Sequence, residues 1–379
     1  MSIQDVIRQT RAHYCLDCGK CTAVCPVNRF DPQFSPRLIV QKALSDSGGA
    51  YADARIWQCV GCNMCMVRCN YNVSYVELIR HLRMQSRLDG TELVYSHGGI
   101  TESVMHMMGR EDASQQRNGW LPSDIQVNRT ADTAFFVGCA PYFDTIFQDL
   151  GVKLTDGTIG ALRLLNAAGV PFNLLDNERC CGHDLLLSGD MQGFIELGRL
   201  NLKQLKAAGI KKVITSCPEC YYTLKVDYAR YIDGWDLAVT HISELSEIGN
   251  LKGNAANKVK AALHDSCKLG RHFKLYDGPR RLLTEVAGAE LQEMENNREN
   301  SLCCGASPWM FCGAVNRQIQ DERLRQAGAA GADCMVTSCP KCQIHLTCAT
   351  ASGDSKYAGV KVVDLYHLAA QGLAQKENG

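Results

Sequence analysis

The sequence has no excess charge of either sign, no long apolar run and no nucleotide-binding fingerprint. Its 40 basic and 40 acidic side chains balance, so there is no electrostatic argument for binding nucleic acid or an anionic membrane surface. No stretch approaches the length of an apolar membrane span, and residues 1–15 lack the apolar core of a signal peptide. No G-x-G-x-x-G motif follows a strand pattern, so a flavin would have to belong to a partner. We expect a cytoplasmic protein without a transmembrane segment.

Cysteine is the residue that this sequence has in abundance. Its 379 residues include 21 cysteines, an odd number that disulfides cannot pair completely. The chain is long and 46% hydrophobic, so it can form a core without disulfides. In a reducing compartment, clustered thiolates usually bind metal. The cysteines fall in three groups, within residues 15–69, 139–220 and 267–348.

The first group contains two motifs with the spacing of iron-sulfur ligands. Residues 15–26 read C-x2-C-x2-C-x3-C-P, and residues 59–69 repeat the spacing, with Asn70 in place of the proline. In such pairs the fourth cysteine of each motif serves the other cluster. We therefore expect two cubane [4Fe-4S] clusters, the first bound by Cys15, Cys18, Cys21 and Cys69 and the second by Cys59, Cys62, Cys65 and Cys25. Two zinc sites are the alternative, because C-x2-C pairs also suit tetrahedral zinc.

The second and third groups form an internal repeat. The segment Ser-Cys-Pro-x-Cys at 216–220 recurs at 338–342, and Cys-Cys-Gly at 180–182 recurs at 303–305. Nearly equal offsets between these anchors indicate duplicated domains. Each copy alternates strand and helix patterns, which favours a parallel sheet. In the first copy the expected strands are 133–137, 172–175 and 212–215, and the expected helices are 158–166 and 190–208.

The N-terminal part has a different pattern, with helices expected at residues 37–44 and 76–88. The predicted fold class is α+β overall: a mostly helical, ferredoxin-like domain with two clusters, followed by two duplicated α/β domains with parallel sheets. The predicted divisions are a ferredoxin-like domain at 1–95, a linker at 96–130, and cysteine-rich domains at 131–255 and 256–379.

The order of these motifs is similar to the heterodisulfide reductase family. The chain resembles a fusion of the family's C subunit, with two cubanes, to its B subunit, with two cysteine-rich CCG domains, which is the arrangement of the D subunit. The resemblance implies that each five-cysteine set binds a noncubane [4Fe-4S] cluster. The first set is Cys139, Cys180, Cys181, Cys217 and Cys220, and the second is Cys267, Cys303, Cys304, Cys339 and Cys342. A thioredoxin-type dithiol is the alternative for each C-x-x-C pair.

The resemblance also implies the iron-sulfur subunit of a multi-subunit oxidoreductase that reduces a disulfide. The implied electron donor is a flavin-containing A-like subunit or a ferredoxin-like protein, and the substrate would be an anionic disulfide. An alternative is an electron relay, without disulfide cleavage, in an electron-bifurcating, benzoyl-CoA reductase-type or glycolate- or lactate-oxidising complex. A zinc-stabilised scaffold without redox activity is a third hypothesis.

Within this scheme we assign the catalytic role to the second set. A basic run at 268–274 follows Cys267, and it can bind an anionic ligand or neutralise a reduced cluster; a solvated basic surface is the alternative. His183 is a candidate proton donor, although a structural histidine is the more common case. Three cysteines lie outside every motif, and we expect them to be ordinary buried thiols: Cys312, Cys334 and Cys348.

Overall fold

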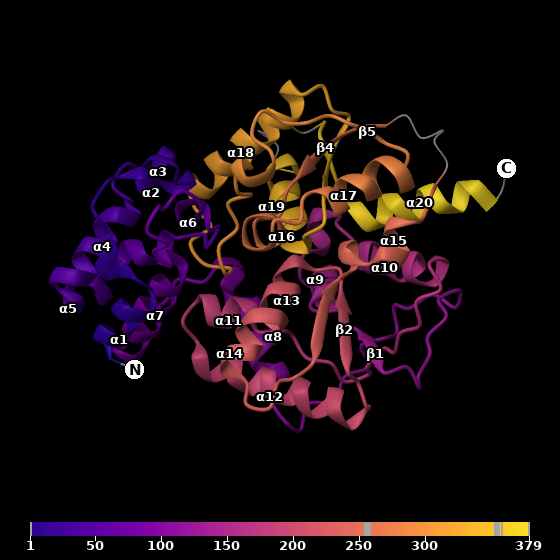
Figure 1. The fold of residues 1–379 in the computed structure, drawn as a ribbon, viewed down its shortest axis with the longest axis horizontal. Helices are drawn as coiled ribbons and strands as arrows, with labels where there is room; N and C mark the ends of the chain where they lie inside the picture. The colour runs from indigo at the N-terminus through magenta and orange to yellow at the C-terminus, as the bar shows by residue number, and fades with distance from the viewer. Residues whose placement is uncertain (1, 254–258, 352–356, 358, 378–379) are drawn as a thin grey trace.

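The computed structural model describes residues 2–253, 259–351, 357 and 359–377 (Figure 1). Its N-terminal part is helical, and none of the described residues before 133 lies in a strand of a sheet. The helices are α1 (Ile3–Gln9), α2 (Lys20–Ala23), α3 (Pro26–Phe30), α4 (Pro36–Ser45), α5 (Ser47–Tyr51), α6 (Met64–Val67) and α7 (Tyr75–Leu88). Short 3-10 turns at Ala12–Tyr14 and Ala54–Gln58 connect them.

The sequence explains the two longer helices of this part. α4 begins where predicted: the Ser35 hydroxyl accepts a hydrogen bond from the Leu38 N–H, and Pro36 takes the first helical position. α7 buries one apolar face, including Leu78 and Leu82. That face belongs to a core that also contains side chains of the third cysteine group.

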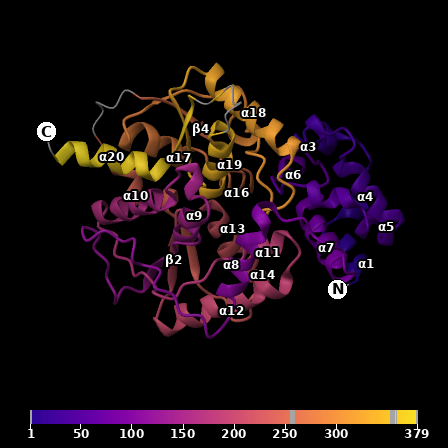
Figure 2. The same ribbon diagram turned by 180° about the vertical axis from the view of Figure 1, so that it is seen from behind.

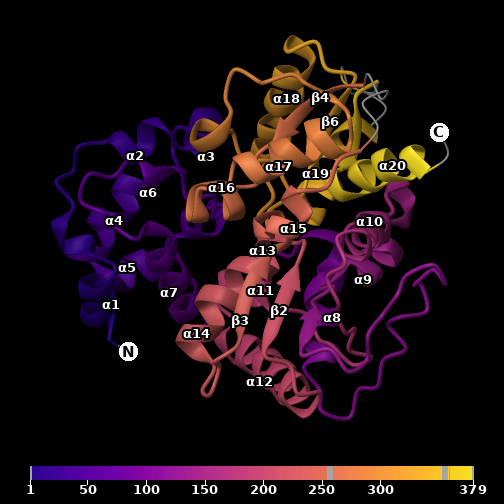
Figure 3. The same cartoon turned by 45° about the vertical axis from the view of Figure 1, so that its right-hand side comes forward.

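The first parallel sheet has the strand order β1-β2-β3, with β1 (Thr133–Phe135), β2 (Lys212–Thr215) and β3 (Ala238–His241). The predicted strand 172–175 is reduced to a single parallel bridge between Ala134 and Asn173. The surrounding helices are α9 (Ala140–Ile146), α10 (Leu154–Ala167), α11 (His183–Leu187), α12 (Met191–Ala207), α13 (Pro218–Tyr222), α14 (Tyr228–Tyr231) and α15 (Ser246–Gly249), with a π-helical turn at Thr223–Asp227. Figure 3 shows β2 and β3 side by side.

The second parallel sheet has the strand order β5-β4-β6-β7. Its strands β4, β6 and β7 repeat the order of β1, β2 and β3, and β5 is added at the edge beside β4. Its strands are β4 (Lys260–His264), β5 (Glu290–Leu291), β6 (Cys334–Thr337) and β7 (Lys361–Asp364), and its helices are α16 (Cys267–Phe273), α17 (Asp277–Arg281), α18 (Ala314–Ala329), α19 (Pro340–Ala351) and α20 (Leu365–Glu377). A π-helical turn at Leu282–Val286 follows α17. Mixed helix and parallel sheet agrees with the predicted α+β class.

The two sheet units interlock through helices that pack across their boundary. α20 of the second unit lies along α10 of the first (Figure 1), and a Cβ on Gly160 would lie 2.4 Å from the backbone oxygen of Tyr366. In the reverse direction, a Cβ on Gly278 would lie 2.5 Å from the backbone oxygen of Ser243. One apolar core therefore spans both sheets.

The segment 96–130, expected to be a linker, is packed against the first sheet unit. It contains a 3-10 turn at Ser96–Gly99 and α8 (Ile100–Met108), which contacts α11 and α12 (Figure 2). Met105 and Met108 of α8 are buried. Arg117 is also buried and donates hydrogen bonds to the backbone oxygens of Glu178 and Gly138. Residues 109–119 are polar, so their composition did not indicate this packing.

Candidate metal centres

A first cavity in the N-terminal part is lined by cysteines from both motifs: Cys15, Cys18, Cys21, Cys65 and Cys69. Gly19 has a φ of +78°, a left-handed conformation that lets the chain turn between two of these thiols. Cys18 is exposed, so the cavity lies close to the surface. The fourth cysteine of the second motif, Cys69, thus lies with the first three of the first motif.

A second cavity shows the reciprocal arrangement, with Cys25 of the first motif beside Cys59, Cys62 and Cys65 of the second. Apolar residues close around it, and burial raises the pKa of Cys25, Cys59 and Cys65. A hydrogen bond with Cys303, together with the nearby charge of Arg271, lowers the pKa of Cys62 to about 6.

Arg83 of α7 fixes the loop that carries this second cavity, a role that the motif spacing does not predict. Its guanidinium is fully buried and donates to the backbone oxygens of Ile56, Trp57 and Cys59, at 3.1, 3.1 and 2.7 Å. A fourth bond, of 2.8 Å, reaches the backbone oxygen of Leu187 in the first sheet unit. The position of Arg83 on the buried face of α7 is the only signal that could have indicated this role.

The first five-cysteine set gathers at the carboxyl ends of β1 and β2. Cys139 follows β1 and its Sγ lies 2.8 Å from that of Cys180, while Cys217 follows β2 and caps α13. The thiols of Cys181 and Cys217 also lie beside that of Cys220 and raise its pKa. A Cβ on Gly138 would lie 2.9 Å from the Cys220 Sγ. This is the crevice at which open parallel sheets usually bind ligands.

The second five-cysteine set gathers in the same way at the ends of β4 and β6. The Sγ atoms of Cys304 and Cys342 are 3.3 Å apart, and the thiol of Cys339 lies beside that of Cys342. The thiol of Cys303 lies close enough to those of Cys267, Cys304 and, across the boundary with the N-terminal part, Cys62 for them to raise its pKa. The second N-terminal cavity and the second set are therefore in direct contact.

The two sets meet at a buried group of charges that nothing in the motif spacing predicted. Lys341 is the variable residue of the second Cys-Pro-x-Cys motif, and Glu219 is that of the first. The Lys341 Nζ lies 3.0 Å from a Glu219 carboxylate oxygen and also contacts Asp184. These two carboxylates raise the pKa of Lys341 well above its usual value, although burial opposes them. The ion pair of Lys341 with Glu219 links the two Cys-Pro-x-Cys motifs across the boundary between the sheet units.

Comparisons with known proteins agree with this geometry. Residues 11–73 match the family described as "4Fe-4S dicluster domain", and residues 133–225 and 261–347 each match "Cysteine-rich domain". The D subunit of dihydromethanophenazine:CoB–CoM heterodisulfide reductase from Methanosarcina mazei is 26% identical over 95% of this chain and 93% of its own length. The chain contains a 4Fe-4S dicluster domain and two cysteine-rich domains, and it is similar over nearly its full length to the D subunit of heterodisulfide reductase.

Other relatives of this D-like chain have different names. EtfAB:quinone oxidoreductase of Syntrophomonas wolfei is 28% identical over 86% of the chain and 54% of its own length. The B subunit of fumarate reductase (CoM/CoB) from Methanothermobacter marburgensis is 26% identical over 88% of the chain and 67% of its own length. A solved structure, a putative Asp/Glu racemase of Yersinia pestis, aligns at 17% identity over 65% of the chain and 99% of its own, with a TM-score of only 0.26. The D-like chain is an iron-sulfur oxidoreductase component.

The donor sets of this D-like chain fit iron-sulfur clusters. All of its 21 cysteines are free thiols, and those of the N-terminal motifs and of the second five-cysteine set line cavities. Lys268 gives a further sign: it is buried, lines a cavity with Cys267, Cys303 and Cys339, and its Nζ has no hydrogen-bond partner among the described residues. Leaving an ammonium group buried without a counter-charge costs several kcal/mol. An anionic cluster bound by the second set would supply that charge.

The predicted basic run is a solvated surface only at its end, where Lys274 is exposed. Lys268 and Arg271 are both buried, and the Nε of Arg271 donates to the backbone oxygen of Cys62 at 2.6 Å. His183, the candidate proton donor, is buried with its Nδ1 2.9 Å from the Thr223 hydroxyl, and burial lowers its pKa well below the usual value. His183 is thus held neutral.

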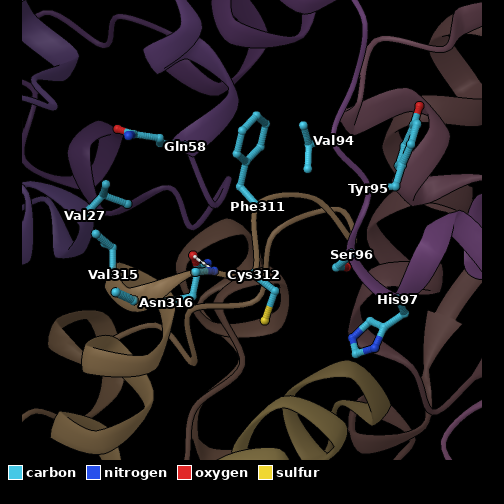
Figure 4. A pocket seen from close by; sticks show the side chains of 12 residues that line it. Val27, Gln58, Val94, Tyr95, Ser96, His97, Phe311, Cys312, Val315 and Asn316 are labelled. Carbon is cyan, nitrogen blue, oxygen red and sulfur yellow. Dashed lines mark hydrogen bonds between the residues drawn. The ribbon is translucent and has the colours of Figure 1, made fainter.

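The three cysteines outside the motifs differ from one another. Cys334 in β6 is buried, as expected, whereas Cys348 is half-buried and Cys312 is exposed. For Cys312 the expectation was wrong, because its side chain lies on the wall of an open cavity (Figure 4). None of the described helices has the length and hydropathy of a membrane span.

Proposed function

We propose that this protein carries electrons through two cubane [4Fe-4S] clusters to two noncubane [4Fe-4S] clusters, which reduce a disulfide. The proposed domains are those of the sequence: 1–95 for the cubanes, 96–130 as the connecting segment, and 131–255 and 256–379 for the noncubane clusters. In the cubane domain the proposed ligands are Cys15, Cys18, Cys21 and Cys69 for the outer cluster, and Cys25, Cys59, Cys62 and Cys65 for the inner one. The two N-terminal cavities, each lined by cysteines of both motifs, support this crossed assignment.

The observation that carries the proposal is the continuous series of thiol sites. It begins at the exposed Cys18 in the first N-terminal cavity and continues to Cys62 in the second. From Cys62 it reaches Cys303 of the second five-cysteine set. From there Lys341 and Glu219 connect the second set to the first. Such a series suits one-electron transfer from a surface donor to an interior site, which is what the clusters would supply.

The residues around the two sets would bind and orient the reacting groups. Cys267, Cys303, Cys304, Cys339 and Cys342 are the proposed catalytic set, because this set adjoins both the second N-terminal cavity and Lys268, whose Nζ lies over the Tyr222 ring but has no hydrogen-bond partner among the described residues. Lys268 would stabilise negative charge at that set, and the pair of Lys341 with Asp184 and Glu219 would keep the two sets at a fixed separation. Leu187 and Ser307 also line the cavity that Lys268 shares with the second set, and their packing would exclude water from it.

The test is turnover by the fully loaded protein, chemically reduced in the absence of oxygen. We expect it to convert the heterodisulfide of coenzymes M and B, the anionic disulfide named with the relatives, to two thiols. Protein with Cys139→Ala, which keeps the second set, and protein with Cys267→Ala, which keeps the first, form a matched pair of controls. Complete loading without any thiol release would refute disulfide reduction.

The second candidate keeps the clusters but not the disulfide chemistry. The likeness to EtfAB:quinone oxidoreductase favours an electron relay inside a larger complex, where a flavoprotein donates and another carrier accepts. Reduction of an added quinone analogue at a rate that exceeds disulfide turnover would favour this function. In both cases we propose a flavin-containing A-like subunit or a ferredoxin-like protein as electron donor.

A further inference from the structure

The two five-cysteine sets have the same backbone donors beside their Cys-Cys-Gly motifs. The Gly182 N–H donates to the Cys180 sulfur, and the Gly305 N–H donates to the Cys303 sulfur, both at 3.4 Å. Because the backbone surrounds the two motifs in the same way, side chains are the place to look for a difference between the two centres.

His264, the last residue of β4, brings a ring nitrogen to the second set. Its side chain is buried, with 2% of the residue exposed, and one of its nitrogens lies within 4.8 Å of the sulfurs of Cys304 and Cys342. An imidazole at this distance from a sulfur can be a metal ligand, a base or a hydrogen-bond donor. The position of its proton decides among these roles.

The first set has no such ring at the corresponding position. His264 stands three residues before Cys267, and Phe136 stands three residues before Cys139. Phe136 is buried in an apolar core that also contains cysteines of the first set. A phenyl ring has no N–H or O–H group, so it cannot donate a hydrogen bond to these sulfurs.

Arg323 of α18 determines where the proton of His264 lies. Arg323 is fully buried, and its Nε donates to the His264 Nδ1 at 3.0 Å. A guanidinium can only donate, so Nδ1 accepts and the ring proton is on Nε2. The other N–H groups donate to uncharged partners, which hold the guanidinium against the ring: the backbone oxygen of Asn296, the Gln326 amide oxygen and the Ser301 hydroxyl, at 2.7, 2.7 and 3.0 Å.

The first unit also lacks the arginine. Counted from the two Ser-Cys-Pro-x-Cys segments, Asn201 corresponds to Arg323. The Asn201 amide donates to the backbone oxygen of Cys180 and to the Tyr228 hydroxyl, at 3.1 and 3.0 Å. It therefore supports the backbone of the first set but brings no positive charge to it.

We propose that the Nε2–H of His264 donates a hydrogen bond to the Cys304 sulfur and makes the centre of the second set easier to reduce than that of the first. Arg323 is the positioning residue, because it keeps the ring in the donating tautomer. Hydrogen bonds to the ligand sulfurs and net charge set the potential of an iron-sulfur centre, and a donor or a cation favours the reduced form. The inference rests on the proposed function, and it distinguishes two sets that have the same five cysteines.

The test is an anaerobic redox titration of full-length, cluster-loaded protein, followed by electron paramagnetic resonance. Cys139→Ala and Cys267→Ala proteins show which signal belongs to which set. In the wild type the second-set signal should titrate at the higher potential. His264→Phe copies the first unit, and it should lower the second-set potential by at least ~59 mV, a tenfold change for a one-electron couple, without moving that of the first set.

Three variants separate the hydrogen bond from a general loss of packing. His264→Gln keeps an N–H donor and should restore most of the lost potential. Arg323→Lys keeps a charged donor and should stay close to the wild type, whereas Arg323→Met releases the tautomer and should lower the second-set potential. Phe136→Leu, in the first unit, is the matched control and should leave the second-set potential unchanged.

A spectroscopic signature decides the matter if His264→Phe protein does not fold. In Cys139→Ala protein labelled with [15N]histidine, pulsed resonance of the reduced second set should show a histidine nitrogen coupling that disappears when His264→Gln is added. In protein with about 16 irons per chain, an unchanged potential, an equal shift of both sets or an unaltered coupling would overturn this inference alone. About 8 irons would overturn the proposed function and this inference with it.

Discussion

Replacing Lys341 by methionine is expected to destabilise the protein strongly at the junction of the two five-cysteine sets. Lys341 is buried between the carboxylates of Asp184 and Glu219. Removing one partner of a buried ion pair leaves an uncompensated charge and costs about 3–5 kcal/mol. Burial already raises the pKa of Glu219 to about 7. Without the ammonium group both carboxyls would take up protons more readily, so the loss of stability should be greater at alkaline than at mildly acidic pH.

The same reasoning predicts a rescue. Lys341→Met combined with Asp184→Asn and Glu219→Gln removes the unpaired charges, and replacing a complete buried ion network by neutral groups is often close to neutral. The assay is the guanidinium midpoint of anaerobic protein, followed by the visible absorbance of the clusters and by far-UV circular dichroism. A single variant within about 1 kcal/mol of the wild type, or a triple variant no more stable than the single one, would refute the argument.

Three further predictions concern other parts of the structure. Cys69→Ser should remove the same cluster signal in electron paramagnetic resonance as Cys18→Ser, and a different pattern would disprove the crossed ligands. His106 forms an ion pair with Asp190 that raises its pKa to about 10, so the stability it adds relative to His106→Gln should be full below about pH 6.5 and lost as the pH rises through its folded pKa. Gly189→Ala should lower the melting temperature, because φ is +85° and the new Cβ would lie 2.5 Å from the Met84 nitrogen; an unchanged value would show that this turn adapts.

Motif spacing and periodicity were enough to predict much of the local structure. The helix from Pro36 and the strand 212–215 follow from a cap signal and a short apolar run, and both are present. The strands expected at 133–137 and 212–215 end just before Cys139 and Cys217, and parallel strands bring their carboxyl ends to one edge. Local patterns of this kind depend on neighbouring residues, so the sequence alone contains them.

Contacts between distant segments were not predictable in this way. The Cys62 thiol lies beside that of Cys303, and Arg83 donates a hydrogen bond to the backbone oxygen of Leu187, only because the helical part packs against both sheet units. Lys341 and Glu219 stand at variable positions of their motifs, where spacing carries no information about charge. Cys312 was misjudged for a related reason: its exposure depends on how residues 311–316 are placed against Val27, Gln58 and residues 94–97, with which they line a cavity.

The most direct test of the central claim is the amount of iron and acid-labile sulfide per chain in protein isolated without oxygen. Two cubanes and two four-iron noncubane clusters predict about 16 irons per chain. Protein with Cys139→Ala should then contain about 4 fewer, and so should protein with Cys267→Ala. A value near 8 in the wild type, unchanged in both variants, would leave the ten cysteines of the two sheet units without metal and would contradict the proposed function.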